Sequence, residues 1–570
     1  MKKLTSFLLT LLMATSLSGC GNNEDSGRNS YGGYDNDEDN PYLVEDQFDK
    51  DGKLIISYFA IDLDSLQSQT DDTKKIMEYI ENKFQVKFKY LTGTSSSWQN
   101  VLNQYIGGGD VPDIFFHNKS EPSYSTWLDE GYLFNYSTFL NDYPNLKAAF
   151  ERYDAASVKS LLGGDYYGYP IVMDSKTDSD IINEHALYYR RDWYTELKNN
   201  NWKPSSGRNL VDPEDPSFNY LNFYDLCEGF TYGDPDDNGK DDTYGYALTK
   251  DGGVYWWYPI LSLFGVTYDG WHYNETSKEW EPDCTSDAMK EAVMFMADMY
   301  DKGFINSNYA TTCTQANMKN EFANGVAGMM TYNATYPMGQ GVLDLMTSYT
   351  SGGLALSDVV RGMPVPTGKD GTKHMFGYAN RYGYNSINND VTTNKKKTIM
   401  SIMDWLLSEE GQMVVNYGLK DTHYTLNSDG TVNSLLGNDK NGYPKTLYSS
   451  DVAPGAYRIK GLVSWSTEIP TFIQHYEEQM QLLNAWDRQY LTPNPLAYCS
   501  VDAEFALTIS GLEDDIEIAY KDIVAKISGN AASKRETTWN DFVKKYNVKA
   551  SSYIEAMNES ADKLSIITGK

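Results

Sequence analysis

The alternation of apolar patterns between residues 53 and 116 is the feature that most restricts the fold of this chain. Lys53 to Phe59 is a short apolar run, Ile76 to Phe84 carries apolar residues at helical spacing, and Val86 to Tyr90 alternates as a strand does. A further apolar run, Val111 to Phe116, follows three consecutive glycines. The order strand, helix, strand with another run behind it indicates a parallel α/β layer.

Helices are predicted downstream from the same kind of pattern. The apolar residues between Met289 and Tyr300 share one helical face, and Gly303 is a stop signal. The segment 399–406 shows the same periodicity, and Ser408 is placed to cap a following helix that ends at Gly418. The body of about 520 residues is long enough for more than one core, and it shows no repeat of fixed period.

The N-terminus has the pattern of a lipoprotein export signal. Two lysines precede the apolar run Leu4 to Leu17, which is too short to span about 30 Å of hydrocarbon comfortably. Leu17-Ser18-Gly19-Cys20 then matches the bacterial lipobox. We therefore expect residues 1–19 to be a signal peptide and Cys20 to carry the lipid; the alternative is an ordinary secretory signal that happens to end in cysteine.

Residues 20–52 are interpreted as the lipidated cysteine and a flexible acidic tether. Gly, Asn, Asp, Glu and Ser dominate this segment, so it buries too little apolar area to offset the entropy of ordering. The lipid would then be the membrane attachment, and the folded body would stand at the outer face of a bacterial cell membrane.

Charge and composition exclude some partners. A formal net charge of −31 leaves no basic excess for phosphates, which argues against a nucleic acid partner and against electrostatic binding to anionic lipid. An aromatic content of 14% suits sugar-stacking surfaces, although each single ring is more often a core residue. Four cysteines beyond Cys20 are widely separated and lack metal-type spacing, which leaves disulfides and free thiols both open: Cys227, Cys284, Cys313 and Cys499.

The segment Asp234 to Asp242 resembles most of a calcium-binding EF-hand loop. Oxygen donors recur at every second position, with a glycine at the sixth position, and the predicted ligands are Asp234, Asp236, Asn238, Lys240 through its backbone carbonyl, and Asp242. Gly245 stands where the loop's bidentate glutamate belongs, and a strand-like run follows. Several carboxylates in one turn repel each other unless a cation neutralises them, which favours a structural calcium over a solvated Asx-rich turn.

Enzyme signatures are absent from the sequence. No G-x-S-x-G, H-E-x-x-H or Walker motif occurs, and the histidines show no catalytic spacing. A glycosidase pair of carboxylates stays open, because the separation of two carboxylates is invisible in sequence. The chain is therefore predicted not to be an enzyme.

A series of short motifs carries a family resemblance through nearly the whole body. In chain order they are Val111–Ile114 (VPDI), Tyr167–Pro170 (YGYP), Leu187–Trp193 (LYYRRDW), Glu321–Met329 (EFANGVAGM), Asp404–Gln412 (DWLLSEEGQ), Asn416–Gly418 (NYG) and His423-Tyr424. Their order resembles the large extracellular solute-binding lipoproteins of carbohydrate ABC importers, which include the alginate-binding proteins. Lys420-Asp421 departs from the Glu-Gly pair expected after the tyrosine and glycine, so no role is assigned there.

The resemblance implies an α/β fold of the periplasmic-binding-protein type, class II, with two lobes, several crossover strands and a ligand cleft between the lobes. It implies an N-terminal lobe from residues 53–180 plus about 380–450 and a C-terminal lobe from 181–379 plus about 451–570. Crossovers are expected near 174–187, near 376–386 and between 430 and 461. The calcium loop is also carried by the alginate-binding relatives.

Functionally, the resemblance implies a monomeric substrate-binding subunit that captures an oligosaccharide and delivers it to ABC permease subunits. Residues that follow strands or lie near crossovers are the predicted cleft contacts: Tyr58, Phe59, His117, Trp256, Trp257, Tyr332, Asn333, Arg381 and Trp465. At least one ring of the Tyr255–Tyr258 cluster is expected to be exposed. The alternatives are an exported glycan-active enzyme and a binding protein for a peptide or another non-sugar solute.

Overall fold

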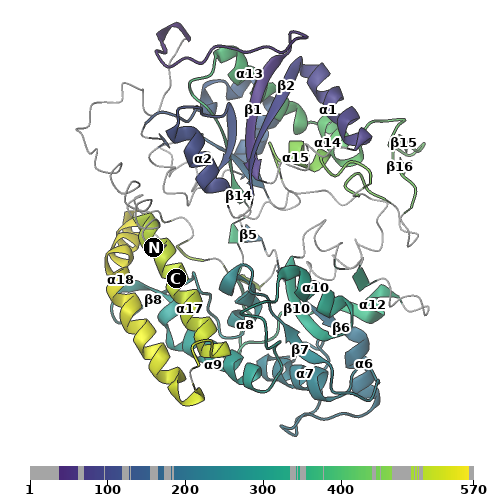
Figure 1. Ribbon diagram of the computed structural model, residues 1–570, viewed down its shortest axis with the longest axis vertical. Coiled ribbons are helices and arrows are strands. Elements are labelled where there is room, and N and C mark those ends of the chain that lie inside the picture. Colours follow the sequence, from purple (N-terminus) through teal and green to yellow (C-terminus); the bar gives the residue numbers. More distant parts are fainter. Residues whose placement is uncertain are drawn as a thin grey trace, which may run out of the picture.

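The fold consists of two lobes, one above the other in Figure 1. The computed structural model describes residues 37–61, 70–94, 97–117, 127–128, 130–153, 165–172, 181–182, 185–333, 342, 345–346, 355–376, 378–379, 381–438, 445–449, 451–464, 490–492, 494–496, 499, 505–529 and 531–563. The predicted signal peptide and Cys20 lie outside the described residues. Within the described part, no helix is both long and apolar enough to cross a membrane.

A five-stranded mixed sheet forms the centre of the first lobe. Its strand order is β2-β1-β3-β14-β4, with strands β1 (Leu54–Ile61), β2 (Val86–Gly93), β3 (Ile114–His117), β4 (Tyr169–Val172) and β14 (Arg381–Ile387). β1 pairs in parallel with β2 and β3, whereas β14 runs antiparallel to β3 and β4. The predicted parallel α/β layer is confirmed, and β14, from much later in the chain, is inserted antiparallel between β3 and β4.

Helices cover both sides of this sheet and supply much of the first core. They are α1 (Asp71–Phe84), α2 (Trp98–Gly107), α4 (Pro144–Tyr153), α13 (Thr393–Leu406), α14 (Glu409–Tyr417) and α15 (Ala456–Lys460). A small hairpin, β15 (Tyr424–Leu426) with β16 (Val432–Ser434), lies at one side. As predicted, Ser408 caps α14 by accepting a hydrogen bond from Gly411 N, and Gly418 ends that helix at a φ of 88°.

The second lobe has a four-stranded sheet in the order β11-β6-β10-β7. Its strands are β6 (His185–Arg190), β7 (Tyr244–Ala247), β10 (Ala327–Asn333) and β11 (Val360–Gly362). β10 runs antiparallel to β6 and parallel to β7. A peripheral hairpin is formed by β8 (Trp271–Asn274) and β9 (Glu279–Pro282).

Helices from two distant parts of the chain complete the second core. The first group is α6 (Arg191–Asn199), α7 (Tyr220–Tyr232), α8 (Tyr258–Ser262), α9 (Asp287–Asp301), α10 (Gln315–Ala323) and α12 (Leu356–Val359). The second is the antiparallel pair α17 (Ala506–Ala525) and α18 (Arg535–Lys563), yellow in Figure 1. Short 3-10 turns are η1 (Asp37–Asp39), η3 (Tyr136–Thr138), η4 (Leu140–Asp142), η5 (Gly253–Trp257), η6 (Asp283–Thr285) and η10 (Ala532–Lys534). Tyr520 and Trp539 from the C-terminal pair are buried in the same core as Trp257 and Met296.

Two very short strand pairs belong to the connections. β5 (Ile181–Ile182) pairs with β13 (Tyr378–Ala379), and β12 (Met375–Phe376) pairs with β17 (Leu491–Thr492). β5 lies between the lobes in Figure 1. β5, β12 and β13 fall at or next to two of the segments where crossovers were expected, whereas β17 lies well beyond the third expected segment, 430–461.

The predicted lobe boundary near residue 450 differs from the structure. Residues 451–464 belong to the first lobe, because Val452, Ala453, Ile459 and Leu462 are buried in its core. Asn385 on β14 also donates to the carbonyls of Gly461 and Leu462, at 2.9 Å each. The first lobe therefore extends at least to residue 464.

The second half of the predicted tether is also ordered. Asp37 accepts hydrogen bonds from the backbone and hydroxyl of Thr393, both at 2.8 Å, and Asp46 accepts from the Thr392 hydroxyl at 2.8 Å. These carboxylates lie at the N-terminus of α13, where the helix dipole favours negative charge. The composition of residues 37–52 suggested disorder, but their acids bind this helix end.

Several motifs of the family resemblance have structural roles. Asp113 of the VPDI motif accepts from Ser57 N at 2.7 Å and pairs with Lys395 Nζ at 3.2 Å. Both members of this ion pair are buried, so it fastens α13 to the strands of the first sheet. The four cysteines left open by the sequence, Cys227 to Cys499, are free thiols.

Candidate functional site

The first-lobe side of the site is the end of the sheet where β3 stops and β14 begins. His117 is the last residue of β3 and pairs in register with Tyr384 of β14. Its ring lies parallel to that of Tyr384, at 5.9 Å and 21°, and edge-on to Trp127. His117 is therefore at the predicted edge, held in an aromatic setting.

A hydrogen-bond chain fixes the His117 ring. Ser386 Oγ donates to the carbonyl of Tyr167 at 2.6 Å, and His117 Nε2 lies 2.7 Å from the same Oγ. Because the single hydroxyl proton is used on Tyr167, Nε2 must carry the proton and donate to Ser386. The ring is fully buried, so this chain of hydrogen bonds fixes its position and its tautomer inside the first lobe.

Tyr58 and Phe59 were predicted as cleft contacts, and the structure places both in the first core. β1 is an inner strand of its sheet, and its last four residues are all buried, so both faces of the sheet are covered at this end of the strand. Their side chains, 1% and 0% exposed, therefore do not present a surface to a ligand.

The second-lobe side of the site is the end of the sheet where β10 stops and β6 begins. Asn333, the last residue of β10, pairs in register with His185, the first residue of β6. Tyr188 donates its hydroxyl to the Asn333 carbonyl at 2.9 Å. Because β6 follows closely on β5, this end of the sheet faces the first lobe, and Figure 1 shows β10 and α10 on that side.

An aromatic cluster covers this end of the sheet. Trp256 and Tyr332 stack at 5.6 Å and 11°, and the His185 ring meets Trp256 and Tyr255 edge-on at 4.8 and 4.7 Å. Trp256 is 4% exposed and Tyr332 is 7% exposed, whereas Tyr255 is only partly buried. In the described part of the chain, the buried indole Nε1 of Trp256 has no hydrogen-bond partner.

His185 is neutral in this cluster. Burial lowers the pKa of His185 to about 3, against a weaker opposing effect from its hydrogen bond with Asn333. A neutral imidazole offers one donor and one acceptor, as a sugar hydroxyl does. The cluster therefore combines stacked rings with uncharged polar groups.

The other predicted contacts have different outcomes. Trp257 is fully buried between Tyr309 and Tyr520 in the second core, because the 3-10 turn η5 directs it inward, away from Trp256. Arg381 begins β14 at a register shift next to Gly383, and only its backbone is described. Trp465 lies outside the described residues.

Sequence reasoning missed His185, Tyr255 and Lys319 in this cluster. Lys319 on α10 has its Nζ 4.6 Å from the Tyr332 ring centroid and 3.2 Å from the Tyr332 hydroxyl. His185 lies inside the predicted crossover near 174–187, so its position was a usable signal. Lys319 comes from a separate helix, and only the tertiary fold brings it to Tyr332.

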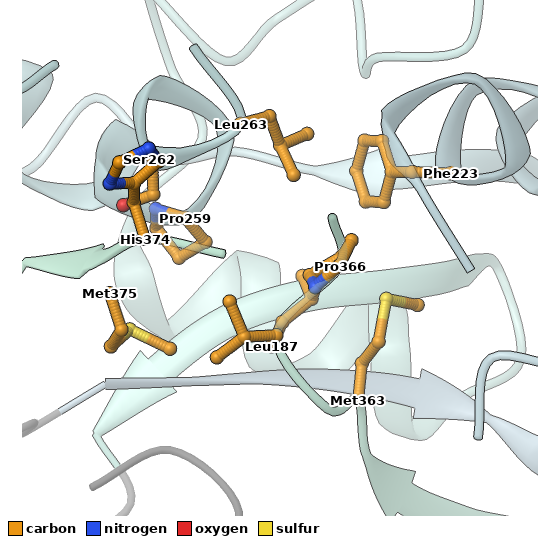
Figure 2. A pocket seen from close by; sticks show the side chains of 10 residues that line it. Leu187, Phe223, Pro259, Ser262, Leu263, Met363, Pro366, His374 and Met375 are labelled. Atoms are coloured by element: carbon orange, nitrogen blue, oxygen red, sulfur yellow. The ribbon is translucent and has the colours of Figure 1, made fainter. Parts of the chain in front are cut away.

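A small apolar pocket lies elsewhere in the second lobe, between α8, β6 and the segment leading into β12 (Figure 2). Its ten lining residues include Leu187, Pro259, Met363 and Met375, whose side chains surround the space in Figure 2. A volume of about 20 Å³ holds one or two waters. The pocket is therefore far too small for an oligosaccharide.

The loop 234–242 forms a tight acidic turn on the second lobe. Asn238 Nδ2 donates to Asp236 at 2.6 Å and to Asp242 at 3.1 Å, and Asp234 accepts from the backbone N of Asn238 at 3.1 Å. Partial burial, together with the charges of Asp242 and Asp234, raises the pKa of Asp236.

The donor set of this loop fits calcium, although the loop is not a formed coordination shell. Among the described residues, no group of three or more His, Cys, Asp and Glu side chains is arranged to hold a metal. Instead, the side-chain nitrogen of Asn238 lies between the carboxylates of Asp236 and Asp242. Rotating the amide by half a turn would exchange its nitrogen and oxygen, and the oxygen would then point to this place. A side chain at Gly245 would force the backbone to move, since a Cβ there would lie 2.7 Å from Cys227 Cα. This explains why the EF-hand glutamate is missing.

Comparison with known proteins decides the family. The family model of bacterial extracellular solute-binding proteins matches residues 67–413. The chain belongs to this family. This solute-binding protein is 26% identical to the lipoprotein LipO of Bacillus subtilis over 389 residues, which cover 67% of this chain and 68% of LipO. It is 21% identical to the polygalacturonan/rhamnogalacturonan-binding protein YtcQ of the same organism over 383 residues, covering 67% of this chain and 69% of YtcQ.

A solved structure confirms the fold class. The HMO-binding solute-binding protein associated with an ABC transporter of Bifidobacterium longum infantis aligns with a TM-score of 0.64 at 16% identity. The alignment covers 91% of this chain and 100% of that chain. The two-lobe fold predicted for this solute-binding protein is therefore correct, and the His117 and Trp256 edges belong to opposite lobes.

Proposed function

We propose that this solute-binding protein captures an oligosaccharide between its lobes and delivers it to the permease of an ABC importer. The observation that carries the proposal is the cluster of Trp256, Tyr332, His185 and Asn333 at the edge of the second sheet that faces the first lobe. YtcQ, described as binding polygalacturonan and rhamnogalacturonan, supports a glycan ligand. The family consists of binding proteins, which supports capture without catalysis.

The cluster suits a sugar because a pyranose has an apolar C–H face and a rim of hydroxyls. Aromatic rings pack against the apolar face, while buried hydroxyls need hydrogen-bond partners. Trp256 Nε1 is a buried donor that a ligand hydroxyl would satisfy. Closure of the lobes would exclude water and strengthen each such bond.

A thermal-shift screen against an oligosaccharide panel, followed by calorimetry, tests the proposal. A ligand that binds only the folded protein raises its melting temperature. We expect at least one glycan to bind without being cleaved. Release of products would favour an exported glycan-active enzyme, and a shift with peptides alone would contradict the sugar proposal.

A matched pair of tryptophan variants locates the site. Trp256→Phe keeps a ring but removes the N–H, so it should weaken glycan binding about threefold to tenfold, the value of one hydrogen bond. Trp257→Phe makes the same change one residue away, where the indole N–H is also buried without a partner among the described residues but belongs to the core. Equal affinities for the two variants would place the ligand elsewhere.

We also propose that the loop 234–242 binds one structural calcium through Asp234, Asp236, Asn238, the carbonyl of Lys240 and Asp242. The cation would offset the repulsion of the three carboxylates and fix the loop. The test is metal analysis of dialysed protein and its melting temperature with and without chelator. Asp236→Ala should abolish both metal content and chelator sensitivity, whereas Asp241→Ala, outside the ligand set, should retain them.

A third proposal concerns anchoring. The lipobox sequence ending at Cys20 supports a lipid on that residue, and the likeness to a lipoprotein agrees with it. Cys20→Ala should move the protein from the detergent phase to the aqueous phase in a partition assay. A variant that stays with the membrane fraction would contradict the anchor.

A further inference from the structure

Lys319 and Tyr332 form a cation–aromatic pair at the second-lobe edge. The Lys319 Nζ lies over the Tyr332 ring and donates to its hydroxyl, at 4.6 and 3.2 Å. An ammonium has three donors, so this contact uses one of them. Lys319 is only partly buried, and it lies beside Tyr332 near the end of β10, the edge of the second sheet that faces the first lobe.

The outer face of the same lobe holds a matched pair with one difference. Lys302 Nζ lies 5.0 Å from the Tyr224 ring centroid and 2.5 Å from its hydroxyl. Asp298 Oδ2 lies 3.4 Å from that Nζ and neutralises it. Within the described part of the chain, Lys319 Nζ makes no ion pair. The two pairs share their geometry, and Lys319 alone lacks the carboxylate.

Acids that contact α10 are engaged with other groups. Glu321, two residues along the helix, accepts from the hydroxyl of Tyr244, and Asp251 accepts from Gln315 N at 2.8 Å. The neighbouring His185 is neutral because burial lowers its pKa to about 3. A positive charge therefore stands beside the aromatic cluster, in a protein whose net charge is −31.

We propose that Lys319 makes the site selective for a carboxylate-bearing sugar, a uronate, over neutral sugars. This inference rests on the proposed oligosaccharide function. With the sugar ring against the aromatic cluster, its carboxylate would take the place that Asp298 holds beside Lys302. The hydrogen bond between ammonium and carboxylate is charge-assisted, and it strengthens as closure of the lobes removes water.

The experiment compares two probes with the same sugar chain, trigalacturonic acid, whose carboxylates are charged, and its methyl ester, whose carboxyl groups are neutral. Calorimetry at low salt should give the wild-type protein about tenfold to hundredfold tighter binding of the acid, the value of a hydrogen bond to a charged group. Lys319→Gln should remove the preference, and Lys319→Arg should keep most of it. Lys302→Gln is the matched control and should leave the preference unchanged.

Equal binding of acid and ester by the wild-type protein, or a preference that survives Lys319→Gln, would overturn the inference. Binding of neutral oligosaccharides with no binding of either galacturonide would also overturn it while leaving the proposed function intact. If no glycan in the panel binds, both the proposed oligosaccharide function and the uronate inference would be wrong. Melting temperatures of all variants within a few degrees of wild type ensure that affinity, not folding, is compared.

Discussion

The two facing edges of the lobes are built differently. At the first-lobe edge, His117, Ser386 and the Tyr167 carbonyl form a chain in which each proton is already used. At the second-lobe edge, the Trp256 indole has no partner and Lys319 has no counter-ion in the described part of the chain. Polar groups that are already satisfied hold a scaffold together, whereas donors in surplus are available for recognition.

The first prediction tests whether the buried ion pair between Asp113 and Lys395 stabilises the first lobe. Asp113→Ala leaves the Lys395 ammonium buried without its partner, which should cost about 3–5 kcal/mol of unfolding free energy. Chemical denaturation measures the loss. Glu275→Ala, which breaks an exposed pair with Lys278, is the control and should cost less than about 1 kcal/mol. Similar losses of unfolding free energy in Asp113→Ala and Glu275→Ala would show that the buried pair does not stabilise the first lobe.

The second prediction uses pH to probe the second-lobe edge. The pKa of His185 is lowered to about 3 from an ordinary value of 6.5, so the folded state binds fewer protons than the unfolded state in that interval. The contribution of neutral His185 to the stability of the folded protein is fully present above about pH 6.5 and is lost as the pH falls towards 3. Between pH 6.5 and 4.5 the wild type should lose about 2–3 kcal/mol more than His185→Gln, at about 1.4 kcal/mol per unit.

A second histidine provides the control for this pH effect. The hydrogen bond that His272 Nδ1 donates to the Asp283 carboxylate raises the pKa of His272, so the contribution of His272 to stability is present at low pH and is lost as the pH rises. His272→Gln should therefore shift the pH profile of stability in the opposite direction to His185→Gln. Shifts of the same sign in both variants would contradict the assignment of a neutral His185.

The third prediction separates scaffold from recognition directly. Ser386→Ala leaves His117 Nε2 and the Tyr167 carbonyl without their shared partner, which should cost about 1–2 kcal/mol of stability. Glycan affinity should change less than about threefold, the opposite of the pattern expected for Trp256→Phe. A loss of affinity larger than the loss of stability would move the recognition site onto the first lobe.

Local chemistry explains which parts of the fold could be predicted. The helix from Glu409 to Tyr417 was predicted with both ends, because Ser408 and Gly418 act through short-range backbone contacts. The segment 37–52 was interpreted as tether because composition cannot reveal that Asp37 and Asp46 bind a helix that begins at residue 393. The boundary near 450 was wrong for a similar reason, since Asn385 holds residues 461 and 462 from a distant strand.

The site was harder to predict than the fold. Trp256 and Trp257 are adjacent in sequence, and only the turn of η5 sends one to the interlobe edge and the other into the core. Tyr58 and Phe59 were predicted to lie at the end of their strand, but β1 continues to Ile61 and both side chains are buried within it. Lys319 differs from Lys302 only by the absence of a nearby carboxylate, which depends on three-dimensional packing.

The position of α17 and α18 in the chain has a consequence for biosynthesis. Tyr520 and Trp539, on these last two helices, occupy the centre of the second core with side chains from residues 187–363. Until α18 has emerged from the ribosome, that core lacks one wall, and its apolar residues stay exposed. Nascent chains would therefore reach the secretion machinery without a completed second lobe, in the unfolded form that threading through a translocon requires.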